Sequence, residues 1–278
     1  MHHHNHYYGQ AHILARYCGL NDRFPPPIPG YLQHGWNIFD GWNPQHEFYD
    51  GAWRFVWSDA PRRRGYMLGR REYRVVGAPW NYLLQMEPDL GVVADEKREG
   101  TLWFLFHGWE GGKITGQHAR LIDEIKETEP GPVTMSLYYT EYERPEIRRV
   151  YEKAGFRVIS FGKRGWLYED THRMFLYHQL QEFRRHARVA SNRLSTAVFY
   201  GASVGCVPAV YGDPMELAGE DQAFGGTARI ARLWPELIGK DLDLTAAREV
   251  VDAELGVSAL HSPEELRMLF DWERHDER

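Results

Sequence analysis

From residue 100 onward, short apolar runs alternate with longer amphipathic stretches. The apolar runs predict buried strands at 101–106, 133–139, 156–161, 188–191 and 207–211. The stretches between them predict helices, one of which begins at Pro145 and ends before Gly155. This alternation is typical of α/β proteins in which helices cover both faces of a parallel, doubly wound sheet. Ligands of such sheets bind at the carboxyl ends of the strands.

The first ninety residues follow a less regular pattern. They predict a helix at 11–18 and short strands at 30–34, 53–58 and 73–76. Residues 86–100 contain Pro88, two glycines and a charged run, which predict a linker. Near the end of the chain, Ser262, Pro263 and Glu265 form the capping-box pattern of a helix start. We therefore expect domains at 1–90 and 99–256, followed by a helical segment at 257–278 that could cross back to the first domain.

Composition narrows the class of protein. A chain of 278 residues can bury a substantial core. No apolar run approaches the roughly 20 residues of a membrane span, and the amino terminus lacks the hydrophobic stretch of a signal peptide, so a cytoplasmic location is expected. Cys18 and Cys206 stand in apolar surroundings without metal-ligand spacing, which predicts buried free thiols.

Charge is unevenly distributed along the chain. The net charge of −6 argues against general nucleic-acid binding, and the part from Lys240 onward, with 5 basic and 11 acidic residues, carries the acidic excess. Residues 54–74 hold seven arginines against two acids. This segment could attract a phosphate-bearing acceptor, or it could be a solvated surface.

The segment 191–213 is the most informative part of the chain. A turn of hydroxyl and amide residues leads into a helix of small side chains: Ala197, Gly201, Ala202, Ser203 and Gly205. Glycine inside a helix costs about 1 kcal/mol relative to alanine, which favours close packing against a neighbour. Ser195 and Thr196 fall at the first turn, where free N–H groups and the helix dipole favour an anion such as phosphate. The alternative is a helix whose small residues serve packing alone.

This segment resembles the carboxyl-terminal domain of GT-B-fold glycosyltransferases, and most closely the bacterial capsule and wall-polymer group that includes relatives of the CDP-glycerol polymerases. The likeness is carried by Ser191, Ser195, Thr196, Ala202, Gly205, Pro208 and Gly212, with Pro208 one residue later than in the family pattern. It covers residues 100–213. It implies two Rossmann-like domains, the amino-terminal one reduced, and a nucleotide-activated donor whose diphosphate is held by Asn192, Arg193, Ser195 and Thr196.

Other residues are candidates for donor binding. The glycine-rich loop 108–116 lets backbone N–H groups approach a ligand, and it places Gly112 and Lys113 near a donor phosphate. Its spacing is not that of a P-loop, which disfavours ATP hydrolysis. Arg164 follows the third strand and could pair with phosphate. Tyr139 follows the second strand and could stack on a base or sugar, or pack in the core.

A transferase also needs a base for the acceptor hydroxyl. His34 follows a short apolar strand and precedes Gly35, and this turn also resembles the wall-polymer transferases, where the histidine is the proposed base. An imidazole can take a proton at neutral pH. Asp40, Asp59 and Glu110 are rival candidates for that role.

The sequence contains no established metal-binding motif. The opening HHHNH reads as a tag, a native histidine cluster or a weak metal site in a disordered terminus, and the chain has neither HExxH nor DxD. The resemblance implies a metal-independent, cofactor-free transfer of a sugar or related group to an acceptor hydroxyl in polysaccharide biosynthesis. A nucleotide-sugar epimerase or hydrolase, and a non-catalytic nucleotide-binding protein, are the alternatives. The sequence specifies neither the donor sugar and base, the acceptor nor the oligomeric state.

Overall fold

A computed structural model describes residues 3–43, 46–108, 114–165, 171–218 and 226–273. Contacts divide the chain into two compact units. Unit 1 comprises Met1–Leu90, Lys163–Tyr177 and Val251–Arg278, and unit 2 comprises Gly91–Gly162 and His178–Val250. The boundary at Leu90 falls within the expected linker, whereas the return of Lys163–Tyr177 to unit 1 has no signal in the sequence.

Unit 2 is built on a five-stranded parallel sheet with the order β7-β6-β4-β8-β9. The strands are β4 (Thr101–Phe104), β6 (Val133–Ser136), β7 (Arg157–Ile159), β8 (Arg188–Ser191) and β9 (Val207–Val210). The predicted mixed α/β class with parallel strands is therefore confirmed. In chain order the arrangement is third, second, first, fourth, fifth, a Rossmann-like order that reverses direction between β4 and β8.

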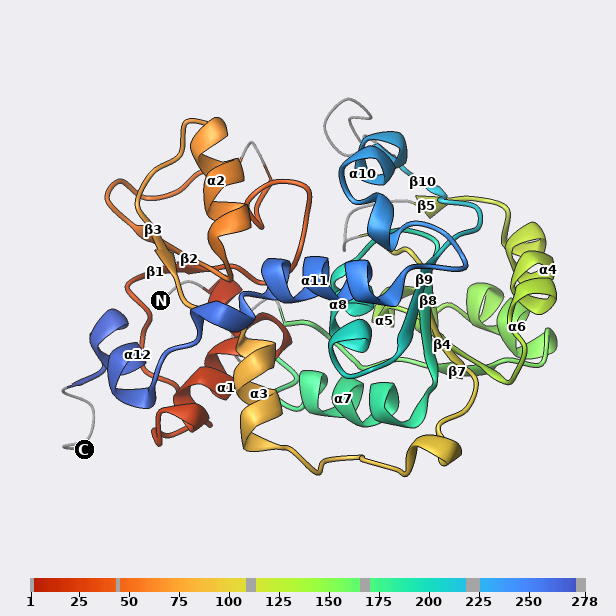
Figure 1. Cartoon of the computed structure of the whole chain (residues 1–278), viewed down its shortest axis with the longest axis horizontal. Helices are drawn as coiled ribbons and strands as arrows, with labels where there is room; N and C mark the ends of the chain where they lie inside the picture. The colour runs from red at the N-terminus through yellow and green to blue at the C-terminus, as the bar shows by residue number, and fades with distance from the viewer. Residues whose placement is uncertain (1–2, 44–45, 109–113, 166–170, 219–225, 274–278) are drawn as a thin grey trace. The chain divides into compact units, whose positions relative to one another are not determined.

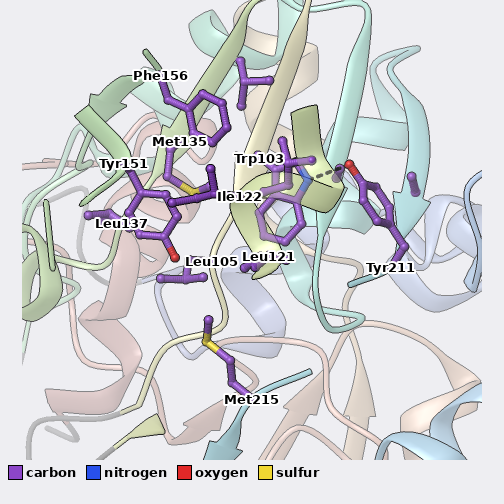
Figure 2. Packing of buried hydrophobic residues seen from close by; sticks show 14 residues of the cluster. Trp103, Leu105, Leu121, Ile122, Met135, Leu137, Tyr151, Phe156, Tyr211 and Met215 are labelled. Carbon is purple, nitrogen blue, oxygen red and sulfur yellow. Dashed lines mark hydrogen bonds between the residues drawn. The ribbon is translucent and has the colours of Figure 1, made fainter. Parts of the chain in front are cut away.

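Helices cover both faces of this sheet, with α4 (His118–Thr128) and α6 (Pro145–Lys153) on one side and α7 (Phe175–Arg185) and α8 (Thr196–Ser203) on the other (Figure 1). The core on the first side is shown in Figure 2. There Leu121, Ile122 and Ile125 of α4 and Tyr151 of α6 pack against Trp103 and other strand residues. The indole N–H of Trp103 donates to the Tyr211 hydroxyl at 3.1 Å, so this core also contains a polar contact.

A buried carboxylate joins the strands of unit 2. Glu129, which follows α4, accepts hydrogen bonds from the hydroxyls of Tyr211, at 2.5 Å, and Thr101. It also forms an ion pair with Arg188 at 3.2 Å. Hydrogen bonds and an opposite charge offset the cost of burying this carboxylate.

The other elements of unit 2 are short, apart from α11. They are η2 (Asp95–Lys97), β5 (Ile114–Thr115), α5 (Tyr139–Tyr142), β10 (Glu216–Leu217), α10 (Thr227–Leu233), η4 (Pro235–Leu237) and α11 (Leu244–Leu255), which continues into unit 1. Strands β5 and β10 form an antiparallel pair that the sequence analysis did not predict.

Unit 1 contains a three-stranded parallel sheet in the order β1-β2-β3. Its elements are η1 (His3–Gly9), α1 (Gln10–Tyr17), β1 (Gly30–Leu32), β2 (Trp53–Val56), α2 (Asp59–Met67), β3 (Tyr73–Val75), α3 (Pro79–Met86), η5 (Val257–Ala259) and α12 (Pro263–Leu269). A buried cluster of Tyr31, Trp42, Val56 and Tyr73 packs on the sheet. The three strands and α1 confirm the predicted elements to within two residues at each end.

The amino terminus is a structural part of unit 1. Asn5 is buried and its amide nitrogen donates to the Gly30 carbonyl at 3.0 Å, while its amide oxygen accepts from the Leu32 N–H at 2.8 Å. Asn5 therefore hydrogen-bonds both ends of β1. His6 is buried as well, and its Nδ1 lies 3.2 Å from Nε2 of His12. The expectation of a disordered histidine-rich terminus is wrong for residues 3–9, because their side chains are used in the fold.

The end of the chain contributes core residues to unit 1. The predicted capping box is confirmed at α12: the Ser262 hydroxyl accepts from the Glu265 N–H, and the Glu265 carboxylate accepts from the Ser262 N–H. Leu266, Phe270 and Trp272 are fully buried. The Trp272 indole N–H donates to the Pro27 carbonyl at 2.8 Å.

Both cysteines are buried free thiols, as predicted. Burial raises the pKa of each thiol to about 12, so neither is a thiolate near neutral pH. Within the described ranges, no helix has the length and apolar character needed to cross a membrane.

Candidate functional site

The predicted phosphate turn lies at the point where the sheet of unit 2 reverses its strand order. Residues 192–195 follow β8, and residues 105–108 follow its neighbour β4. A hydrogen bond links the two loops: the Phe106 N–H donates to Oδ1 of Asn192 at 2.7 Å. In open α/β sheets this is where ligands bind, outside the carboxyl ends of the strands.

Asn192 and Arg193 use their side chains within the protein. Besides accepting from Phe106, the amide of Asn192 donates to the Asp213 carbonyl at 2.7 Å. The Arg193 guanidinium donates to the carbonyls of Pro214, at 2.6 Å, and Met215, and its Cζ lies 3.8 Å from the centroid of the Phe106 ring. Both residues are buried. They fix the loops around the site, a role that spacing in the sequence does not reveal.

Ser195 and Thr196 stand at the start of α8, where the sequence places them. Ser195 is the N-cap residue in an extended conformation, and its side chain makes no cap hydrogen bond. Ser195, Thr196 and Ala197 are half-buried, while the helix from Val198 to Ala202 is buried. The first turn is therefore the part of α8 that a ligand can reach. Helix dipoles favour an anion at such a position.

Close packing positions α8 against the sheet. A Cβ placed on Gly201 would lie 2.7 Å from Cβ and Cγ1 of Val189 in β8. The absence of a side chain at Gly201 lets the helix approach the strand, as its small residues predict.

Asp213 organises the neighbouring loop after β9. Its carboxylate accepts from the Gln117 N–H at 2.9 Å and from the Met215 N–H at 2.8 Å. Met215 has a left-handed φ of 54° and leads directly into β10, which pairs with β5. Asp213 and the β5–β10 pair thus tie the loop after β4 to the loop after β9. Gly112 and Lys113, predicted to contact donor phosphate, lie outside the described residues, as does Glu110.

Aromatic side chains occupy the same edge of the sheet. The exposed imidazole of His107, after β4, stacks on Tyr138 with ring centroids 4.3 Å apart and planes at 18°. Tyr138 in turn meets the half-buried Tyr139 edge to face at 4.8 Å. Tyr139 therefore lies at the expected edge of the sheet. His107 was not predicted, although its position directly after an apolar strand is a signal that could have found it.

His34 lies in unit 1, just after β1. Its carbonyl accepts from the side-chain amide of Gln10 at 2.9 Å, and its ring meets Tyr7 edge to face at 5.1 Å. Burial, followed by the charges of Arg164, His4 and His46, lowers the pKa of His34 to about 3. The imidazole is neutral at pH 7 and can accept a proton, but its surroundings oppose keeping that proton.

Arg164 belongs to unit 1 together with His34, whereas the 192–196 turn belongs to unit 2. The Arg164 carbonyl accepts from the Tyr8 N–H at 2.8 Å, and its guanidinium carbon lies 4.7 Å from the centroid of Tyr7. Within its unit, Arg164 is thus a neighbour of the histidines.

The rival bases have structural partners. The Asp40 carboxylate is fully buried. It forms an ion pair with Arg70 at 2.6 Å and accepts a hydrogen bond from the Tyr73 hydroxyl at 2.5 Å. Asp59, in the first turn of α2, pairs with Arg62 at 2.8 Å. Arg64 forms a bidentate pair with Glu254 at 2.6 and 2.8 Å. Arg62, Arg64 and Arg70 of the arginine-rich segment therefore form ion pairs within the protein.

No protein-family model matches this chain, and no curated protein matches its sequence significantly. The chemical interpretation of the site therefore depends on its geometry. In unit 2, the helix start after β8 and the aromatic rings after β4 and β6 lie at the carboxyl ends of neighbouring strands, where open α/β sheets bind ligands.

Proposed function

We propose that this chain is a glycosyltransferase-like enzyme whose unit 2 binds a nucleotide-activated donor. The observation that carries the proposal is the strand order of unit 2, which puts the 192–196 turn and the loop after β4 side by side where the sheet reverses. Open α/β sheets bind their ligands at that position, and dinucleotides and FMN are known examples. The sequence resemblance to GT-B transferases adds the reaction class.

In this proposal the donor diphosphate is bound by the start of α8. The first-turn N–H groups, with the hydroxyls of Ser195 and Thr196, stabilise the charge that develops on the leaving phosphate. Asn192 and Arg193 act indirectly, because their side chains hold the loops at Phe106 and at Pro214–Met215. His107 and Tyr139 offer ring faces for the nucleobase.

His34 is the proposed base for the acceptor hydroxyl. A base works best with a pKa near the working pH, and the pKa of about 3 is far below it. The proposal therefore requires bound substrate to raise the pKa of His34. If bound substrate does not raise the pKa of His34, the low pKa favours a nucleotide-binding protein without turnover. His34→Asn would then leave every measured reaction unchanged.

The donor site is tested by placing a charge at the first turn of α8. Thr196→Glu repels a diphosphate, whereas Thr196→Gln has a similar shape and no charge. A carboxylate in the first turn of a helix stabilises it by about 0.3–1 kcal/mol, so the glutamate variant should fold at least as well. Binding of UDP, GDP, CDP and TDP compounds is measured by thermal shift and calorimetry.

We expect wild type and Thr196→Gln to bind one nucleotide class with similar affinity. Thr196→Glu should bind it at least about tenfold more weakly, which corresponds to about 1.4 kcal/mol. Equal binding by all three proteins, or no binding of any sugar nucleotide by wild type, would reject the donor site. Transfer to an acceptor, as opposed to release of free sugar or an isomer, separates a transferase from a hydrolase or epimerase.

A further inference from the structure

Unit 1 contains three histidines linked by ring contacts: His34 and His4 both contact Tyr7, and His46 contacts His4. The ring centroids lie 5.1 Å apart in both contacts with Tyr7 and 5.6 Å apart between His4 and His46. The guanidinium carbon of Arg164 lies 4.7 Å from the Tyr7 centroid. These four basic side chains come from the start of the chain, the loops after β1 and before β2, and the segment Lys163–Tyr177.

Two nitrogen atoms of this histidine cluster are buried without a partner. Nδ1 of His34 and Nε2 of His46 make no hydrogen bond to any residue that the structure describes. A buried polar atom left unpaired costs about 1–3 kcal/mol, so native proteins seldom keep one without a use. Two such atoms in one cluster point to a ligand.

The charges around the cluster are mainly positive. Arg164, His4 and His46 act on His34, while Arg70, Arg54 and Asp40 act on His46. Asp40 is the one carboxylate among these groups, and it already pairs with Arg70 at 2.6 Å and with the Tyr73 hydroxyl. The surroundings therefore attract an anion and repel a metal cation.

We propose that His34 and His46, together with Arg164, bind an oxyanion of the phosphate type. Imidazolium N–H groups and guanidinium are strong charge-assisted donors to such a group. All three residues belong to unit 1, whereas the α8 turn of the proposed donor site belongs to unit 2. The ligand class is a small phosphate-bearing molecule. A protonated His34 that binds this anion cannot act as the proposed base at the same time, so the two roles of His34 are alternatives, whereas the α8 site does not involve His34.

Binding of the anion should be coupled to proton uptake. A negative charge beside the cluster favours the protonated imidazoles, which burial and the neighbouring cations now disfavour. Lower pH then strengthens binding. Sulfate is the best probe for this linkage, because its own charge stays constant between pH 6.0 and 7.5 while that of phosphate changes.

The test is calorimetric titration of the full chain with sulfate at pH 6.0 and 7.5, with ionic strength held constant by chloride. We expect saturable binding that is at least about tenfold tighter at pH 6.0. His34→Asn and His46→Gln should each weaken it at least about tenfold, since the amide lacks the positive charge. His178→Gln, a change at an exposed histidine of unit 2, should bind like wild type.

A second readout covers the case in which a cluster variant does not fold. In wild type labelled at histidine, sulfate should shift the imidazole resonances of His34 and His46 and raise their apparent pKa. Absence of saturable sulfate binding, or equal binding by the cluster variants and His178→Gln, would overturn the proposal. Nucleotide binding that is sensitive to Thr196→Glu would still stand in that case, so the two sites fail independently.

Discussion

At Gly201, helix α8 approaches β8 so closely that one methyl group has no room. A methyl carbon added there would lie 2.7 Å from Val189, well inside normal carbon–carbon separation. The close approach of α8 to β8 depends on this packing.

We therefore expect Gly201→Ala to destabilise the protein. Overpacking costs about 1–3 kcal/mol, which exceeds the gain of about 1 kcal/mol from replacing glycine by alanine in a helix. Gly131→Ala is the matched control, because the nearest atom to its new Cβ is Cα of Gly100 at 3.4 Å. Urea unfolding measures both variants. Equal midpoints for Gly201→Ala and Gly131→Ala would show that the packing is not tight.

The buried histidines give the chain an expected acid sensitivity. The pKa values of His12, His34, His46, His118 and His186 are all lowered, in each case chiefly by burial. Their unfolded values lie near 6.5, so below that pH the unfolded chain binds more protons than the folded one. Stability present at pH 7.5 is then lost as the pH falls through 6.5, by at most about 1.4 kcal/mol per pH unit for each histidine. At His34 the loss continues toward its folded pKa of about 3.

Urea unfolding at pH 7.5, 6.0 and 5.0 checks this expectation. The free energy of unfolding should fall with pH in wild type, and less steeply in His34→Asn, which has no proton to gain at that position. Superimposable curves at the three pH values would contradict it.

At the scale of elements, the ends of three neighbouring strands are held together by one amide. Asn192 follows β8, accepts from the Phe106 N–H after β4 and donates to the Asp213 carbonyl after β9. The side chain thereby sets the spacing of the loops at the reversal point.

Asn192→Ala should destabilise unit 2 by about 1–3 kcal/mol, because it leaves a part-buried N–H and a part-buried carbonyl without partners. Asn192→Asp is the informative comparison, since it keeps an acceptor for Phe106 and removes the donor to Asp213. Denaturant unfolding should show both variants less stable than wild type, since the aspartate also turns a carboxylate oxygen toward the Asp213 carbonyl. An alanine variant as stable as wild type would show that the amide does not hold the loops.

Some elements were predictable because their physics is local. Strands buried on both faces read as short apolar runs, as in the TLWF sequence of β4. Strand β8 has only two apolar residues but also begins and ends at the predicted residues. Helix α2 was missed because its arginine-rich sequence has little apolar face, and β5 and β10 because two residues carry no pattern. The turn at 192–196 was placed correctly at the sheet edge. The side chains of Asn192 and Arg193 form hydrogen bonds with backbone groups about 20 or more residues away. No local sequence pattern encodes such tertiary contacts.

At the scale of the whole molecule, unit 1 is assembled from three separate stretches of chain. The last of them supplies the fully buried Leu266, Phe270 and Trp272. Burial of each such side chain contributes about 1.5–3 kcal/mol, and the three together rival the total stability of a typical domain, about 5–15 kcal/mol.

A chain that ends at Gly256 should therefore lose the folded structure of unit 1. Ser262→Ala is the control, because it removes the cap of α12 and keeps the buried residues, at a cost of about 1 kcal/mol. Calorimetric melting and protease resistance of fragments from residues 1–90 measure the outcome. Unchanged melting of the truncated chain would mean that the segment is dispensable.

The three-part composition of unit 1 also bears on the order of events during synthesis. Its sheet and amino-terminal helices leave the ribosome first, yet they wait for Val251–Arg278 before their apolar surface is covered. Unit 2 emerges almost entirely in that interval and can fold ahead of it. A released chain that ends at residue 250 should therefore expose the hydrophobic side of unit 1 to chaperones, while the Rossmann-like sheet is already protected.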